Sequence, residues 1–501
     1  MAAERGRNVL LVVLDTTRKD RLTPYGHDRP TTPTLGAFAD EARVYTEAVA
    51  QAPWTLPVHA SMFTGLYPSE HGATQESPYL GADTGTLAAA LSWDGYATAC
   101  FSSNAWITPY TRLTDGFDEQ DNFFEALPGA VPSLAAGVWE RLTDSRLRPV
   151  ADRLIEVGNG VHERLSASGH GTSRTPAIID RTKRFVDDNA GDRWFACLNL
   201  MDAHLPYYPP ERYREAFAPG VDPDAVCQNS KAYNAGARDV SAAEFDDIRR
   251  LYDAELAHAD AELGRLFEHL RRRGRWEDTA VIVCADHGEL HGEFDRYGHE
   301  FAVYDPLVNV PLLFKHPDIE PGRSDEQVEL LDLYDTILET AFATDAPSAV
   351  GGRPVQSGRS LLSPGRAIPD GEYAFVEYGR PVIELTQLES KAAEAGIELD
   401  RDSAFYSRMR AARRPDAKYI RNETPSDEVY RLDGSGTEAE QLAVTDPRVA
   451  ALEAALDRFL KRHGTAPAGP SKGDRSAGGA RSIEGMDDAM RRRLRELGYL
   501  E

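Results

Sequence analysis

The sequence predicts an α/β protein, with a mainly parallel sheet flanked by helices and a smaller C-terminal α+β subdomain. Apolar runs of six or seven residues recur along much of the chain, as expected for strands buried on both faces. Helical patterns separate these runs, and such alternation is typical of parallel sheets. Polar residues follow several of the runs, at the edge where open α/β sheets bind ligands.

The expected elements follow in order. The first strand, Asn8 to Leu14, delivers Asp15 at its C-terminal end, and helices are expected from about Thr34 to Ala42 and from near Pro57. The alternation then continues with a helix at Thr86 to Leu91, a strand at Ala97 to Ser102, a helix at Ala177 to Asp188, a strand at Trp194 to Leu200, a long helix from about Ala242 to Arg273, and a strand at Thr279 to Cys284.

The pattern divides the chain into a large domain, 1–365, and a small subdomain, 366–463. An amphipathic helical insertion is expected within the large domain, at about 123–174. The small subdomain is indicated by short strand-like segments at Glu372 to Tyr378, Ala417 to Ile420 and Glu428 to Leu432, and by a closing helix at Val449 to Arg462. Residues 464–485 are rich in Gly, Ala, Pro and Ser and are expected to be a flexible linker, and 486–501 a terminal helix.

Composition restricts the partners and the location. The net charge of -25 argues against nucleic acid as a partner, and it suits either a salt-rich cytoplasm or simply an acidic, soluble protein. No run approaches the roughly 20 apolar residues of a transmembrane helix. The short polar stretch Met1 to Arg7 leaves no room for a signal peptide, so we expect a cytoplasmic protein. The four cysteines are widely spaced and indicate no disulfide framework.

Two strand ends carry candidate metal ligands. Asp15 follows the first strand, where an aspartate could equally cap a turn or bind a metal ion. Asp286 and His287 follow the strand at Thr279 to Cys284, and an adjacent carboxylate and imidazole suit Mn²⁺ or Zn²⁺ better than Ca²⁺. For this pair the ligand interpretation is favoured over a simple turn.

A hydroxyl stands at an expected helix start. Thr55 precedes Pro57, and its oxygen could serve as an ordinary helix cap. The same position suits a nucleophile, because a helix N-terminus stabilises the negative charge that builds up during attack at phosphorus or sulfur.

Three further polar residues lie near strand ends. His204 and His299 could be structural residues, and their shared association with strand-end loops only modestly favours a functional role. Asn104 could be an oxyanion donor or a turn former.

The order of these motifs resembles the sulfatase family of the alkaline phosphatase superfamily. The similarity runs through nearly the whole chain apart from 123–174. It is carried by the opening block Val13 to Leu22 with Tyr25 and Gly26, the nucleophile block with Thr55, Pro57, Thr64 to Pro68, His71 and Gly72, the histidine motif with His204, Pro206 and Tyr207, the block Asp286 to Glu289, the stretch with Tyr304 and Val310 to Leu312, and the ending with Lys418 to Ile420, Tyr430 and Leu432.

The resemblance implies an alkaline-phosphatase-like fold and a site with one divalent metal ion, Mn, Zn, Ca or Mg, of which Mn or Zn is favoured by the Asp-His pair. The implied ligands are Asp15, Thr55, Asp286 and His287. The implied catalytic residues are the nucleophile Thr55, then His204, His299, His59 and Asn104. A second metal, held by His204, His299 and Asp202, is possible but ranked below a single ion.

Some positions of this chain depart from the family pattern, and these departures bear on which ester is the substrate. Family sulfatases oxidise a Cys or Ser to formylglycine, with an arginine four positions on, whereas this chain has Thr55 and His59. A threonine can yield only a ketone, so the aldehyde is chemically excluded. Thr16 also interrupts the usual aspartate pair after Asp15.

The sequence therefore predicts a sulfatase-like hydrolase of sulfate or phosphate-type esters, acting on a small molecule or on a glycan or lipid-headgroup ester. One alternative is a phosphodiesterase, phosphonate monoester hydrolase or phosphoglycerol transferase without real sulfatase activity. A mutase-like isomerase would need a fuller two-metal ligand set. An inactive scaffold would lack the ligands that are present here.

Overall fold

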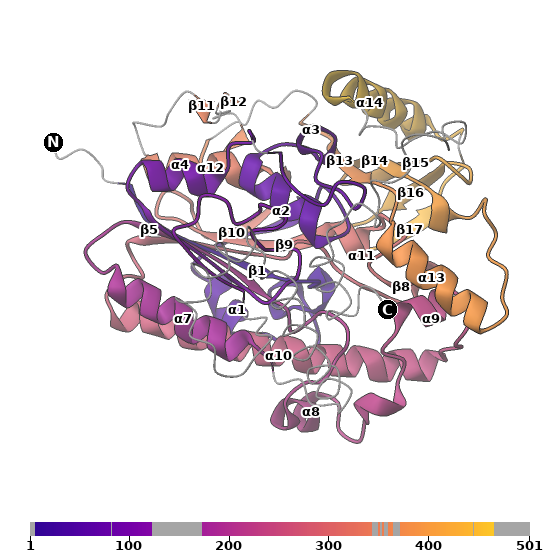
Figure 1. The fold of residues 1–501 in the computed structure, drawn as a ribbon, viewed down its shortest axis with the longest axis horizontal. Coiled ribbons are helices and arrows are strands. Elements are labelled where there is room, and N and C mark those ends of the chain that lie inside the picture. Colours follow the sequence, from indigo (N-terminus) through magenta and orange to yellow (C-terminus); the bar gives the residue numbers. More distant parts are fainter. Residues whose placement is uncertain are drawn as a thin grey trace, which may run out of the picture.

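The centre of the molecule is an eight-stranded sheet (Figure 1). The computed structural model describes residues 6–81, 83–122, 173–342, 349–350, 353–354, 359–363, 371–443 and 445–464. Across the sheet the strands are β10 (Gly322–Glu329), β2 (Arg43–Val49), β9 (Asn309–Lys315), β6 (Thr279–Cys284), β1 (Asn8–Leu14), β5 (Trp194–Leu200), β3 (Ala97–Ser102) and β4 (Glu119–Asn122). Within this sheet β9 runs antiparallel to both of its neighbours, and the other pairings are parallel.

Helices cover both faces of this sheet (Figure 1). One face carries α2 (Thr55–Thr64), α4 (Leu87–Trp93) and α12 (Asp332–Phe342), and the other carries α1 (Pro33–Ala39), α7 (Thr175–Asp188) and the long α10 (Ala242–Arg272). Strand β1 shows why the strands are apolar throughout. Val9, Leu11 and Val13 pack in the core on the α2 side, while Leu10, Val12 and Leu14 pack in the core on the α10 side.

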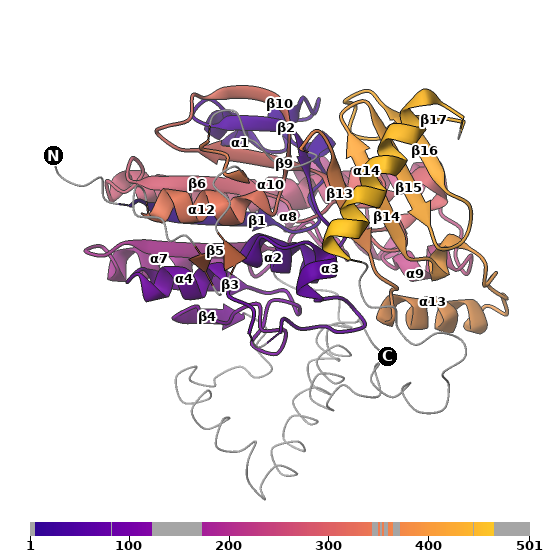
Figure 2. The same cartoon turned by 90° about the horizontal axis from the view of Figure 1, so that it is seen from above.

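A second, antiparallel sheet lies beside the first (Figure 2). Its strands follow chain order: β13 (Ala374–Tyr378), β14 (Met409–Arg414), β15 (Ala417–Asn422), β16 (Glu428–Leu432) and β17 (Glu438–Gln441). Helix α14 (Pro447–His463) covers one face, where the rings of Phe375 and Phe459 stack 4.2 Å apart. Helix α13 (Ile383–Glu394) lies between β13 and β14 in the chain and packs against the short α9 (Ser230–Asn234).

The remaining α-helices and strands of the described residues are short. They are the helices α3 (Pro68–His71), α8 (Glu211–Phe217) and α11 (Asp305–Val308), the ribbon of β7 (Leu290–His291) with β8 (Tyr297–Gly298), and the ribbon of β11 (Ala349–Val350) with β12 (Arg353–Pro354).

Buried charges join the two sheets. Arg413 on β14 is 1% exposed and pairs with Glu47 of β2 at 2.6 Å and with Asp305 of α11 at 2.8 Å. Lys418 on β15 pairs with the same Asp305 at 2.9 Å. These ion pairs fix the small sheet against the large one, and so help to place α13 near the site described below.

The expected fold class is confirmed, and five expected strands have the predicted ends: β1, β3, β5, β6 and β16. The helix expected over Thr34 to Ala42 ends at Ala39, because the next strand already begins at Arg43. Most of the expected insertion (123–172), the domain boundary at 364–370, and nearly all of the expected linker and terminal helix (465–501) lie outside the described residues. Among the described helices none is both long and apolar enough to cross a membrane.

Candidate active site

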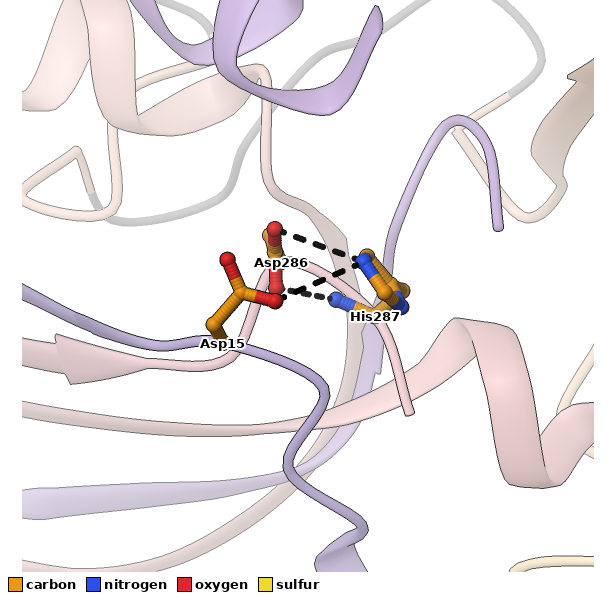
Figure 3. Close-up of side chains that lie close together, drawn as sticks. All are labelled: Asp15, Asp286 and His287. Carbon is orange, nitrogen blue, oxygen red and sulfur yellow. Dashed lines mark hydrogen bonds and ion pairs between the residues drawn. The ribbon is translucent and has the colours of Figure 1, made fainter. Parts of the chain in front are cut away.

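Three buried side chains meet at the C-terminal edge of the central sheet (Figure 3). Asp15 follows β1, and Asp286 and His287 follow β6, which is the direct neighbour of β1. All three are fully buried, and one ligand atom from each lies within 4.8 Å of the others. Nε2 of His287 is 3.5 Å from Oδ2 of Asp286 and 3.9 Å from Oδ1 of Asp15. Parallel neighbouring strands therefore bring together residues some 270 positions apart.

The backbone on either side of this cluster is closely constrained. A Cβ atom at Gly288 would lie 2.0 Å from the carbonyl oxygen of Pro306, so this close approach requires glycine. Thr16 adopts a positive φ of 57°, which is uncommon for a side chain branched at Cβ. In this conformation its N–H donates to Asp286 Oδ1 at 3.2 Å and its hydroxyl donates to Asp15 Oδ1 at 2.7 Å. Thr16 thus orients both carboxylates.

The electrostatics of the cluster fit a divalent cation. Burial, with the charge of Asp15, raises the pKa of Asp286 well above its usual range, and Asp286 Oδ2 has no hydrogen-bond partner among the residues that the structure describes. Burial lowers the pKa of His287 to about 3, so its imidazole is neutral at pH 7. Its Nδ1 donates to the Gly288 carbonyl at 3.0 Å, which leaves the Nε2 lone pair facing the carboxylates. Two carboxylates and a neutral imidazole form a donor set for Mn²⁺ or Zn²⁺.

Thr55 lies beside this cluster as the first residue of α2. Trp54 is the N-cap residue of this helix, and its side chain makes no capping hydrogen bond. The Thr55 hydroxyl, one residue further on, contacts residues outside the helix. Thr55 Oγ1 is 3.4 Å from His287 Nε2 and accepts a hydrogen bond from Asn104 Nδ2 at 3.2 Å. The Thr55 hydroxyl therefore contacts other residues of the site and does not act as the helix cap considered above.

Two asparagines hold Asp15. Asn104 Nδ2 donates to Asp15 Oδ2 at 2.8 Å as well as to Thr55, and Asn104 Oδ1 accepts from the Trp106 N–H at 2.8 Å, which fixes the orientation of the amide. Asn199 of β5 donates to the same Asp15 oxygen at 2.9 Å. Asn199 is not among the residues predicted from the sequence; the signal for it is a polar residue inside an otherwise apolar strand.

The histidines 204 and 299 lie on the same side of the site. The ring of His299 is 4.5 Å from that of His287 and 5.2 Å from that of His204. Burial opposes the charged form of His299, but Glu300 and Glu289 outweigh it and raise its pKa to about 9. Nδ1 of His299 lies 3.2 Å from Glu289 Oε1. A cationic imidazole therefore stands beside the cluster at neutral pH, and sequence reasoning had given no role to either glutamate.

His59 supports the start of α2. It is fully buried, its Nδ1 donates to the Thr55 carbonyl oxygen at 3.0 Å, and it lies 3.7 Å from Asp286 Oδ2. Burial lowers its pKa to about 4. Its contacts fit a residue that positions Thr55 and Asp286.

Asp202 has different partners from those considered for a second metal. Its carboxylate lies 2.8 Å from His258 Nδ1 and also accepts hydrogen bonds from Ser173, at 2.6 Å, and from Thr175. Asp202, Glu255 and His258 form a separate buried group. The carboxylate thus has partners other than His204 and His299. Asp202 is therefore not placed to serve as the third ligand of a second metal ion.

Comparison with known proteins decides the family. The sulfatase family model matches residues 7–343. The chain belongs to the sulfatase family. This confirms the resemblance seen in the motifs, and the family is metal-dependent, in keeping with the buried acidic and histidine ligands of the site.

Individual relatives of this sulfatase-family chain are distant. The ulvan-active sulfatase of Formosa agariphila is 25% identical over 327 residues, which cover 63% of this chain and 57% of that relative. The choline-sulfatase of Rhizobium meliloti is 23% identical over 472 residues, covering 90% and 85%. The phosphonate monoester hydrolase of Agrobacterium radiobacter has a similar structure, with a TM-score of 0.63, 20% identity, and coverage of 91% and 96%. That likeness establishes the fold.

Proposed function

We propose that this sulfatase-family chain is a metal-dependent ester hydrolase that uses Thr55 as its nucleophile and prefers phosphorus esters to sulfate esters. The observation that carries the proposal is the position of Thr55 Oγ1, which lies 3.4 Å from His287 Nε2 and accepts a hydrogen bond from Asn104. A hydroxyl held at a helix start beside two carboxylates and a neutral imidazole is arranged for attack on a tetrahedral ester.

The cation would be held by Asp15, Asp286 and His287, together with the Thr55 oxygen. The unpartnered Asp286 oxygen supports this assignment, because an unpaired buried carboxylate is costly unless a positive charge compensates it. A bound divalent ion would lower the pKa of the Thr55 hydroxyl and offset the negative charge that develops during the reaction.

Each side chain then has its own role in the reaction. Thr55 releases its proton to solvent, and its oxygen attacks phosphorus, forming the Thr55 ester while the bond to the leaving oxygen breaks. Asn104 fixes the attacking oxygen by its amide bond. Protonated His299, next to the site, donates a proton to the leaving oxygen. Water then attacks the phosphorus of the Thr55 ester, and the bond from phosphorus to Thr55 Oγ1 breaks. His299 accepts the proton of that water, and the Thr55 oxygen regains a proton from solvent as the product departs.

The preference for phosphorus follows from the nucleophile. Threonine cannot be converted to an aldehyde hydrate, which would expel sulfate by elimination. A threonine sulfate ester must instead be cleaved by a second attack at sulfur, whereas metal-assisted attack at phosphorus is familiar chemistry stabilised by surrounding cations.

A panel of esters with a common aryl leaving group tests the proposal. Aryl sulfate, phosphate monoester, phosphodiester and phosphonate monoester are compared with Mn²⁺, Zn²⁺, Ca²⁺ or Mg²⁺, with and without an acceptor alcohol that reports transfer. We expect the highest kcat/KM for a phosphodiester or phosphonate ester. Thr55-dependent release of sulfate without turnover of any phosphorus ester would overturn the preference and leave Thr55 as the nucleophile.

A further inference from the structure

A narrow pocket opens beside Thr55, and its walls are aromatic. Trp54, Trp106 and Tyr378 line it together with the Thr55 side chain. The two indole rings meet edge to face, with centroids 5.4 Å apart and an interplanar angle of 79°. Trp54 directly precedes the nucleophile, and the Trp106 N–H is bonded to Asn104. The segments that hold the reacting groups therefore also shape this pocket, which places it where one substituent of a substrate ester would lie.

Polar side chains complete the lining: Gln75, His299 and two buried carboxylates. The charge of His299 is offset by Glu289, whose Oε1 lies 3.2 Å from its Nδ1, and by Glu300. Glu300 is 4% exposed and Glu384 is 3% exposed, and each has an Oε2 atom without a hydrogen-bond partner in the described part of the chain. The other oxygen of Glu300 is paired with Lys231, which offsets its charge. Glu384 stands in the first turn of α13, and Gln75, which also accepts a bond from the Val382 N–H, is its hydrogen-bonding neighbour.

The charge of the Glu384 carboxylate is only partly compensated in this setting, by Lys231 and by a hydrogen bond with Gln75. Burial raises its pKa, because its charged form has lost most of its hydration. A neutral apolar ligand would leave both free oxygens unsatisfied. An organic cation would satisfy them and would at the same time lie against aromatic faces, the arrangement by which proteins recognise quaternary ammonium groups.

We propose that this pocket binds the leaving group of the substrate, and that this leaving group carries a positive charge as a quaternary ammonium or protonated amine. The inference rests on the proposed function, since it takes the ester to be cleaved at Thr55. Trp54, Trp106 and Tyr378 supply the aromatic walls, and Glu384 supplies the counter-charge.

Two esters that differ by one atom test the charge. The 2-(trimethylammonio)ethyl ester and the 3,3-dimethylbutyl ester have the same shape, with N⁺ in one where the other has carbon, and both are prepared as phosphorus and sulfate esters. We expect kcat/KM to be at least about tenfold higher for the cationic ester, and Glu384→Gln to remove most of that ratio. Glu394→Gln, which removes one charge from the exposed far end of the same helix, should keep it. Equal kcat/KM for the pair, or an unchanged ratio in Glu384→Gln, would overturn the inference.

Binding supplies a readout that needs no turnover. Calorimetric titration with 2-(trimethylammonio)ethanol and with 3,3-dimethylbutanol should show at least about tenfold tighter binding of the cation to the full chain, and a smaller difference in Glu384→Gln. Selective cation binding without hydrolysis of any ester would refute the proposed function and leave the pocket assignment standing. Thr55-dependent hydrolysis without cation selectivity would refute the pocket assignment and leave the proposed function standing.

Discussion

The Thr55 hydroxyl oxygen lies 3.4 Å from Nε2 of His287, although 232 positions separate the two residues in the sequence. The start of α2 and the end of β6 thus form one unit, in which the candidate nucleophile touches a candidate metal ligand. Under the proposed mechanism the hydroxyl takes part in the reaction, whereas the carboxylates retain the ion. Loss of the hydroxyl and loss of the cation should therefore have different effects on turnover and on metal content.

Replacement of the Thr55 hydroxyl should abolish turnover without loss of the ion. Thr55→Ala should lower kcat by about 10³ or more, whereas Thr55→Ser should keep activity within about one or two orders of magnitude, because the hydroxyl survives. Steady-state kinetics and metal analysis check both variants. Thr64→Ala removes a buried hydroxyl from the other end of α2 and should keep near-parent activity. Parent-like turnover by Thr55→Ala would remove Thr55 from the mechanism.

Removal of the Asp286 charge should abolish metal binding without destabilising the metal-free protein. Asp286→Asn puts a neutral amide in place of a buried carboxylate whose Oδ2 has no hydrogen-bond partner in the described ranges of the chain. In a chelator its Tm should equal or exceed that of the parent, since a charge that is costly to bury is gone. Added Mn²⁺ or Zn²⁺ should raise the Tm of the parent alone. Asp278→Asn, an exposed aspartate just before β6, is the control and should respond as the parent does. An equal metal-induced shift in Asp286→Asn would contradict the assignment.

The buried ion pairs between the sheets should matter far more than exposed ones. Arg413→Met removes the cation that pairs with Glu47 and leaves the buried Asp305 with Lys418 alone, so the free energy of unfolding should fall by about 3–5 kcal/mol. Arg431→Met, whose pair with Glu440 is 40% and 61% exposed, should change it by less than about 1 kcal/mol. Urea unfolding measures both. Similar losses in the two variants would mean that Arg413 contributes no special stability.

Acid should destabilise the chain through His71. Burial lowers the pKa of His71 to about 3 in the folded state, and its Nδ1 accepts the Ala73 N–H at 3.0 Å. The unfolded chain binds the proton near pH 6.5, so stability is complete above that pH and falls as pH drops toward 3. Between pH 7.5 and 5 we expect a loss of about 2 kcal/mol from this group.

A variant isolates this contribution. His71→Asn retains an oxygen that can accept the Ala73 N–H, so its unfolding free energy should depend less on pH, even if it is lower throughout. His463→Gln, at the partly exposed end of α14, should keep the pH dependence of the parent. An identical slope for parent and His71→Asn would contradict the prediction.

Sequence reasoning located the cluster because of a general property of parallel sheets. Asp15 and the Asp286-His287 pair each end an apolar strand, and C-terminal strand ends share one edge. Asp202 shows the limit of the same reasoning. It stands two residues before His204, but in a loop the spacing does not set the direction of a side chain, and its carboxylate contacts His258.

Other features of the fold and the site could not be predicted, because they depend on tertiary contacts. Strand β9 is the reversed strand of the large sheet, and its apolar run does not reveal its direction. It also contains Pro311, which would argue against a central strand, but the pairing with β2 shifts register near this residue. Glu384 reaches the pocket from α13, about 100 residues after His287, and no local pattern connects the two.

Helix α13 belongs to a different stretch of the chain from the residues that surround Thr55, which come from β1, α2, β3 and β6 and the loops that follow them. Natural selection can therefore act on the two stretches separately. Under the proposed assignment of the pocket, substitutions at the start of α13 would alter which substituent is accepted, while Thr55 and the candidate metal ligands stay unchanged. Homologues with new substrates could thus arise by drift in one helix, and an engineer who wishes to redirect this enzyme has a short, well-defined segment to randomise.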